Sequence, residues 1–351
     1  MPKSERTYSK SKSPIFYDVI IIGAGVTGLA AAMYAGRLNL QTLVLGDSSS
    51  NELPIGGVIT LTEVVENYPG FKRLTGPELA EKIRDHALDY KDKVEIKKER
   101  VLEVLKSSKE SMCFLIKTDE NKSYWSKTII IATGTKWKKL PMKGALEYES
   151  KGVHYCALCD GFAFKNKIVA VVGGSDTAAK EALLLTEYAK KVYIIYRGEK
   201  IRPEPINGER VEKNKKIEVI LNTNVIEIKG DKFVNHLILD KPCKGSKNLK
   251  LDGVFGAIGN IPLSDIAKSL SVEINEKGEI IIDHHDSTTN VKGIFAAGDV
   301  VDTEFKQAIT GVAEGVTAAH SAYKFINENA FVCTFDDKLY RDKKEKYTKQ
   351  I

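Results

Sequence analysis

Residues 18–28, which read DVIIIGAGVTG, decide the fold of this chain. The run after Asp18 is apolar and β-branched, as expected of a parallel strand buried on both faces. Glycines come next in the spacing G-x-G-x-x-G, at Gly23, Gly25 and Gly28. A helix predicted over residues 29–38 and a strand over 41–45 complete a β-α-β unit. Such a turn admits a pyrophosphate at the helix N-terminus, so a nucleotide site is predicted here, with a ligand-free tight turn as the alternative.

The same pattern recurs in the middle of the chain. A strand is predicted over residues 167–172, a helix over 179–188 and a further strand over 191–196. The turn between strand and helix comprises Gly173, Gly174, Ser175, Asp176, Thr177 and Ala178. Ser175 stands where the first turn has its middle glycine, so a pyrophosphate sits slightly further out while the hydroxyl can donate a hydrogen bond. Two such turns indicate two α/β domains.

Side chains beyond the strand ends can select the nucleotide. Asp47 lies 19 residues after Gly28, where a ribose-binding carboxylate is expected, although a plain loop aspartate is the alternative. Arg197 and Arg202 follow the last strand of the second unit and suit the 2′-phosphate of NADPH. Glu199 between them does not favour a phosphate, and a solvated loop is the alternative.

Two further strand–turn segments, at residues 128–134 and 254–259, mark where the chain leaves the first domain and returns to it. We therefore predict an α/β fold with two Rossmann-like nucleotide-binding domains, each of three layers, the second inserted into the first. The predicted parts are a disordered basic tail at 1–14, a discontinuous outer domain at 15–138 and 258–328, an inserted domain at 139–257 and a charged tail at 329–351.

Composition argues against several classes of function. The 351 residues are 42% hydrophobic and 28% charged, which is ordinary for a globular protein. Of the net charge of +6, residues 1–14 carry +3 and residues 331–351 carry +2, so the body offers no basic face for nucleic acid. The sequence shows neither an apolar run of about 18 residues nor a secretory signal, so we expect no membrane partner and a cytoplasmic location.

Cys156 and Cys159 form a C-x-x-C pair that Asp160 follows directly. Half of a zinc site would need two more ligands, and the sequence has no second C-x-x-C; two inert buried cysteines are another interpretation. A redox dithiol is favoured, because the two-residue spacer lets one thiol attack and the other resolve. Asp160 can exchange a proton with the thiolate, and no metal is expected.

Seven short motifs, in their order and spacing, together resemble the low-molecular-weight thioredoxin reductase family over residues 16–325. They are GAGVTG at 23–28, GG at 56–57, TEVVENYPGF at 62–71, ATG at 132–134, CALCDG at 156–161, GIFAAGDV at 293–300 and KQAIT at 306–310.

The resemblance implies that the outer domain binds FAD and that the inserted domain binds a nicotinamide nucleotide and carries the cysteine pair. The flavin positions are Gly23, Gly25, Thr27, Gly28, Gly46, Asp47, Gly56, Gly57, Val58, Thr62, Asn67, Ala132, Thr133, Gly134, Gly298, Asp299, Lys306, Gln307 and Ala308. The nicotinamide positions are Gly173, Gly174, Ser175, Asp176, Thr177, Arg197 and Arg202.

Four positions depart from the family pattern. Val58 stands where the family usually has Gln, so that side-chain contact is missing. Ser175 replaces the third of three glycines, and Tyr196-Arg197-Gly198 replaces His-Arg-Arg. Two of three phosphate-binding arginines remain, so NADPH is the expected donor, with NADH or another electron donor as alternatives.

The resemblance also implies a function: a homodimeric thioredoxin reductase that passes electrons from NADPH through FAD to the cysteine pair and then to thioredoxin. Cys159 would face the flavin, Cys156 would attack the partner disulfide, and Asp160 would be the acid and base. The alternatives are a flavin disulfide reductase that uses NADH or ferredoxin or serves a glutaredoxin-like or peroxidase partner, a flavin-binding redox sensor, and a zinc module.

Overall fold

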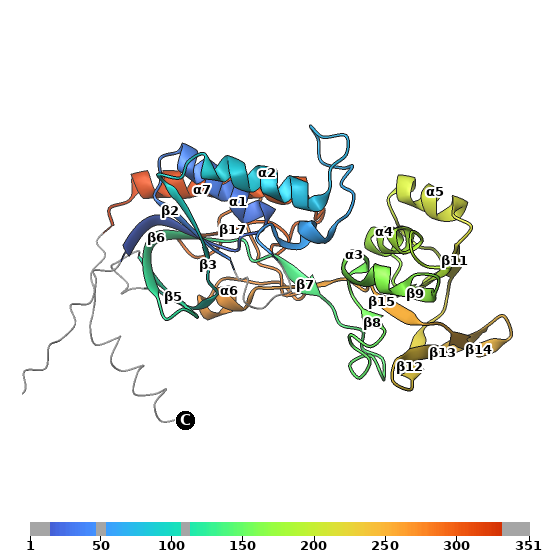
Figure 1. The fold of residues 1–351 in the computed structure, drawn as a ribbon. Coiled ribbons are helices and arrows are strands. Elements are labelled where there is room, and N and C mark those ends of the chain that lie inside the picture. Colours follow the sequence, from blue (N-terminus) through green and yellow to red (C-terminus); the bar gives the residue numbers. More distant parts are fainter. Residues whose placement is uncertain (1–14, 47–53, 107–112, 332–351) are drawn as a thin grey trace, which may run out of the picture. The chain divides into compact units, whose positions relative to one another are not determined.

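The computed structural model describes residues 15–46, 54–106 and 113–331, which divide into two compact units (Figure 1). Unit 2 consists of Leu61–Val64 and Thr135–Ile261, and unit 1 contains the other described residues. The predicted tail at 1–14, Asp47 and the last 20 residues of the predicted C-terminal tail lie outside the described residues. None of the helices in the described ranges is long and apolar enough to cross a membrane.

A seven-stranded sheet forms the centre of unit 1, in the order β3-β2-β1-β6-β5-β4, with β17 paired to β6. Its strands are β1 (Ile15–Ile22), β2 (Thr42–Gly46), β3 (Val94–Lys98), β4 (Val101–Lys106), β5 (Phe114–Thr118), β6 (Ser123–Ile131) and β17 (Ile294–Ala296). The pairs β3-β2, β2-β1, β1-β6 and β6-β17 are parallel, whereas β6-β5 and β5-β4 are antiparallel. Parallel pairing brings the carboxyl ends of β1, β6 and β17 to one edge of the sheet, where ligands bind in such folds.

The sheet of unit 1 is buried on both faces. Alternate residues of β1 enter different apolar clusters: Ile20 and Ile22 on one face, and Val19 and Ile21 on the other. The helices are α1 (Val26–Arg37), α2 (Gly76–Leu88), α6 (Asp265–Ser269) and α7 (Ala308–Glu328), with a 3₁₀ helix, η1 (Gly57–Leu61). Helices α1, α2 and α7 cover the face that Val19 and Ile21 line (Figure 1). Burial on two faces explains why the strand sequence is continuously apolar.

Unit 2 repeats this design around a five-stranded parallel sheet in the order β11-β10-β9-β15-β8. Those strands are β8 (Val153–His154), β9 (Ile168–Val172), β10 (Lys191–Ile195), β11 (Ile217–Ile220) and β15 (Gly253–Gly256). A three-stranded antiparallel sheet consists of β12 (Val225–Gly230), β13 (Val234–Cys243) and β14 (Ser246–Lys250). The helices are α3 (Ala157–Asp160), the 3₁₀ helix η2 (Gly161–Phe164), α4 (Asp176–Leu185) and α5 (Pro205–Lys213).

The two segments where the chain passes between the units pair with each other, as β7 (Thr135–Trp137) and β16 (Asn260–Pro262). A glycine with a left-handed backbone stands beside each: Gly134 with φ +65° and Gly259 with φ +106°. In the described part of the chain, a Cβ at either position would have no atom within 4 Å, so glycine is favoured there by the backbone and not by packing.

Both nucleotide-turn helices begin three residues earlier than predicted, at Val26 and Asp176. Their N-cap residues are Gly25 and Ser175, whose backbones are extended. The last residue of each turn motif therefore already lies in the first helical turn. The glycine pattern obscured this boundary, because glycine is a poor helix former and the motif reads as a loop.

Candidate active site

The first glycine turn joins β1 to α1, and two of its glycines are required by packing. Gly23 has φ +119°, and a Cβ there would lie 2.1 Å from the carbonyl oxygen of Ala132, at the end of β6. A Cβ on Gly28 would lie 1.9 Å from the carbonyl oxygen of Gly23. Because these glycines have no side chain, the turn packs directly against the end of β6, and the predicted residue Ala132 lies at the same edge of the sheet.

Gly25 differs from its two neighbours in the motif. Its φ is −73°, which any residue adopts, and the nearest atoms to a Cβ would be Gly56 O at 3.8 Å and Gly57 Cα at 3.9 Å. Among the residues that the structure describes, none requires glycine here. The missing side chain leaves room at the N-terminus of α1, whose first turn carries no acidic residue. A pyrophosphate group fits such a place.

The predicted pair Gly56-Gly57 lies against this turn. The Val26 amide donates to Gly56 O at 3.2 Å, and the Gly56 amide donates to Ala24 O at 2.8 Å. Gly46, at the end of β2, also abuts the turn, since a Cβ there would lie 2.4 Å from the Ala24 Cβ. Residues that are far apart in sequence thus converge at the carboxyl end of β1.

Asp299 lies three residues after β17, and its side chain is half-buried. Burial raises the pKa of this carboxyl, and the nearby charge of Lys306 opposes the rise. Its carboxyl oxygens have no hydrogen-bond partner among the described residues, so they are available to a ligand hydroxyl. The preceding residue, Gly298, is held by its amide, which donates to Glu314 Oε2 at 2.8 Å. Lys306 donates to the carbonyls of Asp299 and Val301, which closes the loop between them.

Asn67 and Gln307, which are 240 residues apart, meet through a hydrogen bond of 3.0 Å from Asn67 Nδ2 to Gln307 Oε1. Gln307 is the N-cap of α7 and Ala308 is its first residue, so this contact lies at the start of a 21-residue helix. The helix N-terminus directs free amides outward, as the predicted flavin role of Gln307 and Ala308 requires.

Other residues that were predicted to bind the flavin make contacts or hydrogen bonds within the chain, or lie in short local segments. Thr27 lies against α7, since a Cβ on Gly311 would lie 2.5 Å from the Thr27 Oγ1. Thr133 donates from its hydroxyl to Leu263 O at 2.7 Å. Val58 lies in η1, and Thr62 belongs to the short segment Leu61–Val64 of unit 2.

The second glycine turn, between β9 and α4, has the geometry of the first. Gly173 has φ +156°, and a Cβ there would lie 2.1 Å from the carbonyl oxygen of Ala257, next to the end of β15. Ser175 occupies the position equivalent to Gly25, and its side chain makes no cap hydrogen bond. Thr177 is exposed in the first turn of α4. The exposed hydroxyl of Ser175 therefore remains available to a phosphate.

Asp176, a predicted nicotinamide residue, holds the loop that precedes α5. Its carboxylate accepts from the Glu204 amide and from Asn207 Nδ2, both at 2.8 Å. Burial works against ionisation, but Lys180 at 2.7 Å and these two donors outweigh it and lower the pKa of Asp176. The side chain is thus engaged within the chain.

Arg202 is brought back to the second turn, although it lies 27 residues after Ser175. Its amide donates to Gly174 O at 2.7 Å, and its Nη2 donates to the Tyr196 hydroxyl at 3.2 Å. The Tyr196 ring lies over Gly174 and Gly198, where a Cβ would approach ring atoms to 2.4 Å and 2.6 Å. Arg197 follows this ring and is exposed. The position of Tyr196 against the turn was not predicted from sequence.

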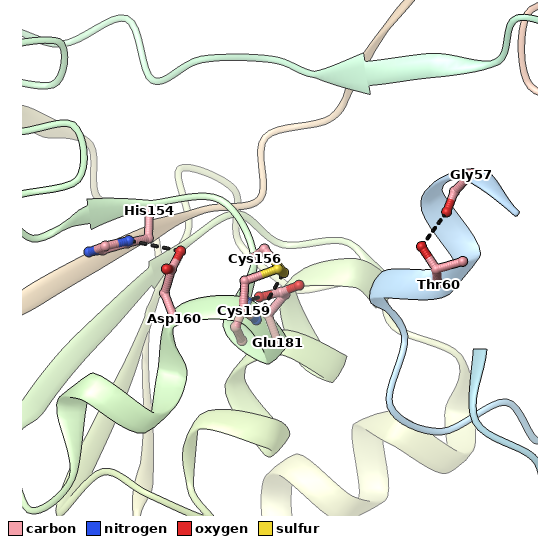
Figure 2. The surroundings of a disulfide bond; sticks show 8 residues. Gly57, Thr60, His154, Cys156, Cys159, Asp160 and Glu181 are labelled. Atoms are coloured by element: carbon pink, nitrogen blue, oxygen red, sulfur yellow. Dashed lines mark hydrogen bonds and ion pairs between the residues drawn. A yellow bond between two sulfur atoms is a disulfide. The ribbon is translucent and has the colours of Figure 1, made fainter. Parts of the chain in front are cut away.

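Cys156 and Cys159 form a disulfide with their Cα atoms 5.4 Å apart (Figure 2). Cys156 is the N-cap of α3 and is buried, and its Sγ accepts a hydrogen bond from the Cys159 amide at 3.1 Å. Cys159 is exposed. The Cys159 amide is thus placed to donate to the Cys156 sulfur, and a hydrogen bond of this kind favours the thiolate form of a cysteine.

Asp160 is oriented by His154, which the sequence did not single out as a site residue. His154 Nδ1 lies 2.9 Å from Asp160 Oδ2, and Figure 2 shows this pair beside the disulfide. The imidazole ring stacks on Phe255 and meets Phe164 edge-on, which fixes its plane. The Asp160 side chain remains 40% exposed, so it can exchange protons with solvent.

Glu181 of α4 was also missed from sequence. Its Oε2 accepts the Ala157 amide, the first amide of α3, at 2.6 Å. Burial raises the pKa of this carboxyl to about 7; the Ala157 amide opposes the rise, and the charge of Asp160 adds to it. The only sequence signal was an acidic residue within the apolar run of α4, and such a residue is more often solvent-facing.

A stability difference follows from this raised pKa. The Glu181 pKa is about 7 in the folded protein against 4.5 ordinarily, so unfolding releases a proton between these values and stability falls as pH rises through them. We expect the unfolding free energy of Glu181→Gln, relative to that of the wild type, to increase by about 3 kcal/mol between pH 4.5 and 7. Above pH 7 the difference is expected to stay constant. Denaturant unfolding of the oxidised proteins measures this, with the exposed Glu187→Gln as control. A difference independent of pH would contradict it.

A model of the pyridine nucleotide-disulphide oxidoreductase family matches residues 17–315. The chain belongs to this family. Membership implies a flavin and a nicotinamide nucleotide as cofactors. The open space at Gly25 and the Asp299 carboxyl, which has no hydrogen-bond partner among the described residues, fit a flavin nucleotide. Within residues 15–46, 54–106 and 113–331, no cluster of three or more His, Cys, Asp or Glu side chains could hold a metal ion.

Relatives in this family are similar along nearly the whole chain. A thioredoxin reductase of Listeria innocua is 40% identical over 314 residues, which cover 89% of this chain and 94% of that protein. One of Bacillus subtilis is 38% identical over 320 residues, which cover 89% and 95%. The predicted resemblance to low-molecular-weight thioredoxin reductases is confirmed, and so is the prediction of an oxidoreductase.

Solved structures of the family share the fold. Lactococcus lactis thioredoxin reductase superposes with a TM-score of 0.81 at 37% identity and covers 89% of this chain and 100% of its own. The T. acidophilum enzyme gives 0.80 at 36% identity and covers 88% and 98%. The predicted α/β fold with two Rossmann-like domains is confirmed.

Proposed function

We propose that this chain reduces the disulfide of a thioredoxin, with electrons that come from NADPH through FAD and the Cys156–Cys159 pair. The observation that supports it most is the disulfide itself, placed at the start of α3 with its sulfur hydrogen-bonded to an amide and a His154–Asp160 pair beside it. That arrangement can take and return electrons and protons without a metal.

FAD in this proposal binds the outer domain, at 15–138 and 258–328, and supplies the two-electron chemistry between nicotinamide and disulfide. The turn at Gly25 would hold its pyrophosphate, Asp299 would accept a hydrogen bond from a ribityl hydroxyl, and the start of α7 would direct amides at the ring system. Val58 adds no polar contact.

The inserted domain, at 139–257, binds the nicotinamide nucleotide and carries the dithiol. Cys159 would face a bound flavin, Cys156 would attack the partner disulfide, and Asp160 would move the proton, with His154 holding its carboxylate in place. Stopped-flow mixing with NADPH and with NADH tests the donor: rapid bleaching of flavin absorbance by either supports this assignment. Failure of both overturns the nicotinamide part of the proposal.

NADH is the second candidate donor, and a specific observation favours it: Gly198 stands where a third basic residue is expected, and Tyr196 engages Arg202. Turnover with thioredoxin, a glutaredoxin-like protein and a peroxidase, each as sole acceptor, identifies the partner. The chain works as a cytoplasmic homodimer in this proposal, which sedimentation and cell fractionation test.

Arg202 carries a prediction about the donor. Removal of a charge-assisted hydrogen bond to a phosphate costs about 1.5–3 kcal/mol. Arg202→Ala is therefore expected to raise the Kd for NADPH about 10-fold to 100-fold, and the Kd for NADH less than about twofold. Isothermal titration of both nucleotides measures this, with Lys200→Ala in the same exposed loop as the matched charge control. Equal losses for both nucleotides would show that Arg202 does not read the 2′-phosphate.

A further inference from the structure

Glu181 stands out among the buried ionisable groups of unit 2, because its carboxyl group touches the element that carries the redox pair. It accepts the amide of Ala157, the residue that directly follows Cys156, at 2.6 Å. Figure 2 shows its carboxyl group beside the two cysteines. It belongs to α4, so it ties the start of α3 to the next helix of the domain.

We propose that Glu181 is a positioning residue that holds the start of α3 and takes up a proton when the Cys156–Cys159 disulfide is reduced. This inference rests on the proposed function, since it requires the pair to be redox-active. The carboxyl group does not touch the substrate or the reacting sulfurs; it acts through the Ala157 amide and through its charge.

The charged groups around Glu181 determine whether its carboxyl group favours the protonated or the ionised form. Strand β9 beneath α4 brings no titratable side chain. Strand β10 brings Lys191, which pairs with Glu218, and Tyr193. Helix α5 brings two acidic and two basic side chains, Glu209, Arg210, Glu212 and Lys213. The charged group that acts on Glu181 is Asp160 of α3, and its negative charge favours the protonated form.

Reduction adds a second negative charge to the same place. Two electrons break the Cys156–Cys159 bond; one sulfur takes a proton and the other remains a thiolate. A new thiolate beside Glu181 further disfavours its carboxylate, so the pKa of Glu181 rises above its value of about 7 in the oxidised protein. Between the two pKa values, reduction therefore consumes two electrons and two protons, and the second proton resides on Glu181.

Glu181→Gln separates positioning from proton uptake. Glutamine keeps a side-chain oxygen that accepts the Ala157 amide, but it binds no proton. The holoenzyme is equilibrated with reduced and oxidised dithiothreitol from pH 5.5 to 9, quenched with acid and alkylated, and the state of the Cys156–Cys159 peptide is counted by mass spectrometry. No nicotinamide or protein partner is needed.

The expected result is that the equilibrium constant for reduction of the wild type, divided by that of Glu181→Gln, depends on pH. The wild-type constant falls relative to that of Glu181→Gln by up to tenfold per pH unit above about pH 7, and the ratio is flat below pH 6. Glu181→Asp retains a carboxyl group and is expected to recover the slope. Glu187→Gln, an exposed carboxyl group just beyond α4, is expected to match the wild type.

Two outcomes would overturn the inference. Parallel pH profiles for wild type and Glu181→Gln would show that no proton on Glu181 is linked to the pair, while the proposed function would stand. A wild-type Cys156–Cys159 disulfide that dithiothreitol does not reduce would overturn both this inference and the proposed function. If Glu181→Gln fails to fold, Glu181→Asp takes its place in the test, and its equilibrium constant for reduction must then depend on pH as that of the wild type does.

Discussion

Replacement of Cys159 by serine is expected to lower disulfide turnover by at least about 10³-fold while leaving reduction of the flavin by the nicotinamide nucleotide intact. The serine oxygen cannot form the Cys156–Cys159 bridge, so electrons have no acceptor between flavin and partner. Stopped-flow absorbance follows flavin reduction, and steady-state turnover with a thioredoxin follows the complete reaction.

Two variants make this result interpretable. Cys156→Ser is expected to show the same separation, because both sulfurs are needed for the bridge. Cys243→Ser, which removes the free cysteine at the end of β13, is expected to retain full turnover. Turnover retained by Cys159→Ser would remove that residue from the reaction and favour a flavoprotein whose dithiol serves another purpose.

A second large effect is expected at Gly25. A Cβ there would meet no atom of the described residues closer than 3.8 Å, so Gly25→Ala is expected to fold. If a flavin pyrophosphate lies over this turn, the added methyl group intrudes on it and weakens FAD binding by about 10²-fold. Flavin content of the purified protein and titration of the apoprotein with FAD measure the loss.

Gly28→Ala provides the contrast, because its Cβ would lie 1.9 Å from the Gly23 carbonyl oxygen and the turn itself must break. Circular dichroism and thermal unfolding separate the two cases: Gly25→Ala stays folded and loses flavin, whereas Gly28→Ala loses the fold. Glu212→Ala, at an exposed position of α5 in unit 2, is the neutral control. Undiminished flavin binding by Gly25→Ala would place the pyrophosphate elsewhere.

The core of each unit could be predicted because its signals are local. Continuous apolar runs marked β1 and β9, and glycine spacing marked the turns after them. The helix starts were missed by three residues, since the turn motif and the first helical turn share the same residues. The C-x-x-C spacing likewise identified the dithiol, because three residues suffice to bring two sulfurs together.

The surroundings of that dithiol could not be predicted in the same way. His154 reaches Asp160 from the end of β8, and Glu181 reaches Ala157 from a helix 24 residues further along the chain. Each contact depends on how two elements pack, and no local pattern encodes that packing. Tyr196 over the second turn is a further example, because only the parallel pairing of β9 and β10 brings it there.

What the amino-acid sequence determined by itself is the chemistry available: two nucleotide turns, a vicinal pair of cysteines and the family to which they belong. What only the tertiary structure decided is the purpose of each group within those motifs. Gly23 and Gly28 are glycines because backbone atoms crowd them, whereas Gly25 is a glycine that leaves space. The Asp176 carboxylate is hydrogen-bonded within its own chain, whereas the Asp299 carboxyl has no such partner in the described ranges. Crowding and partnership arise between segments that meet only after folding, so they cannot be deduced from spacing along the chain.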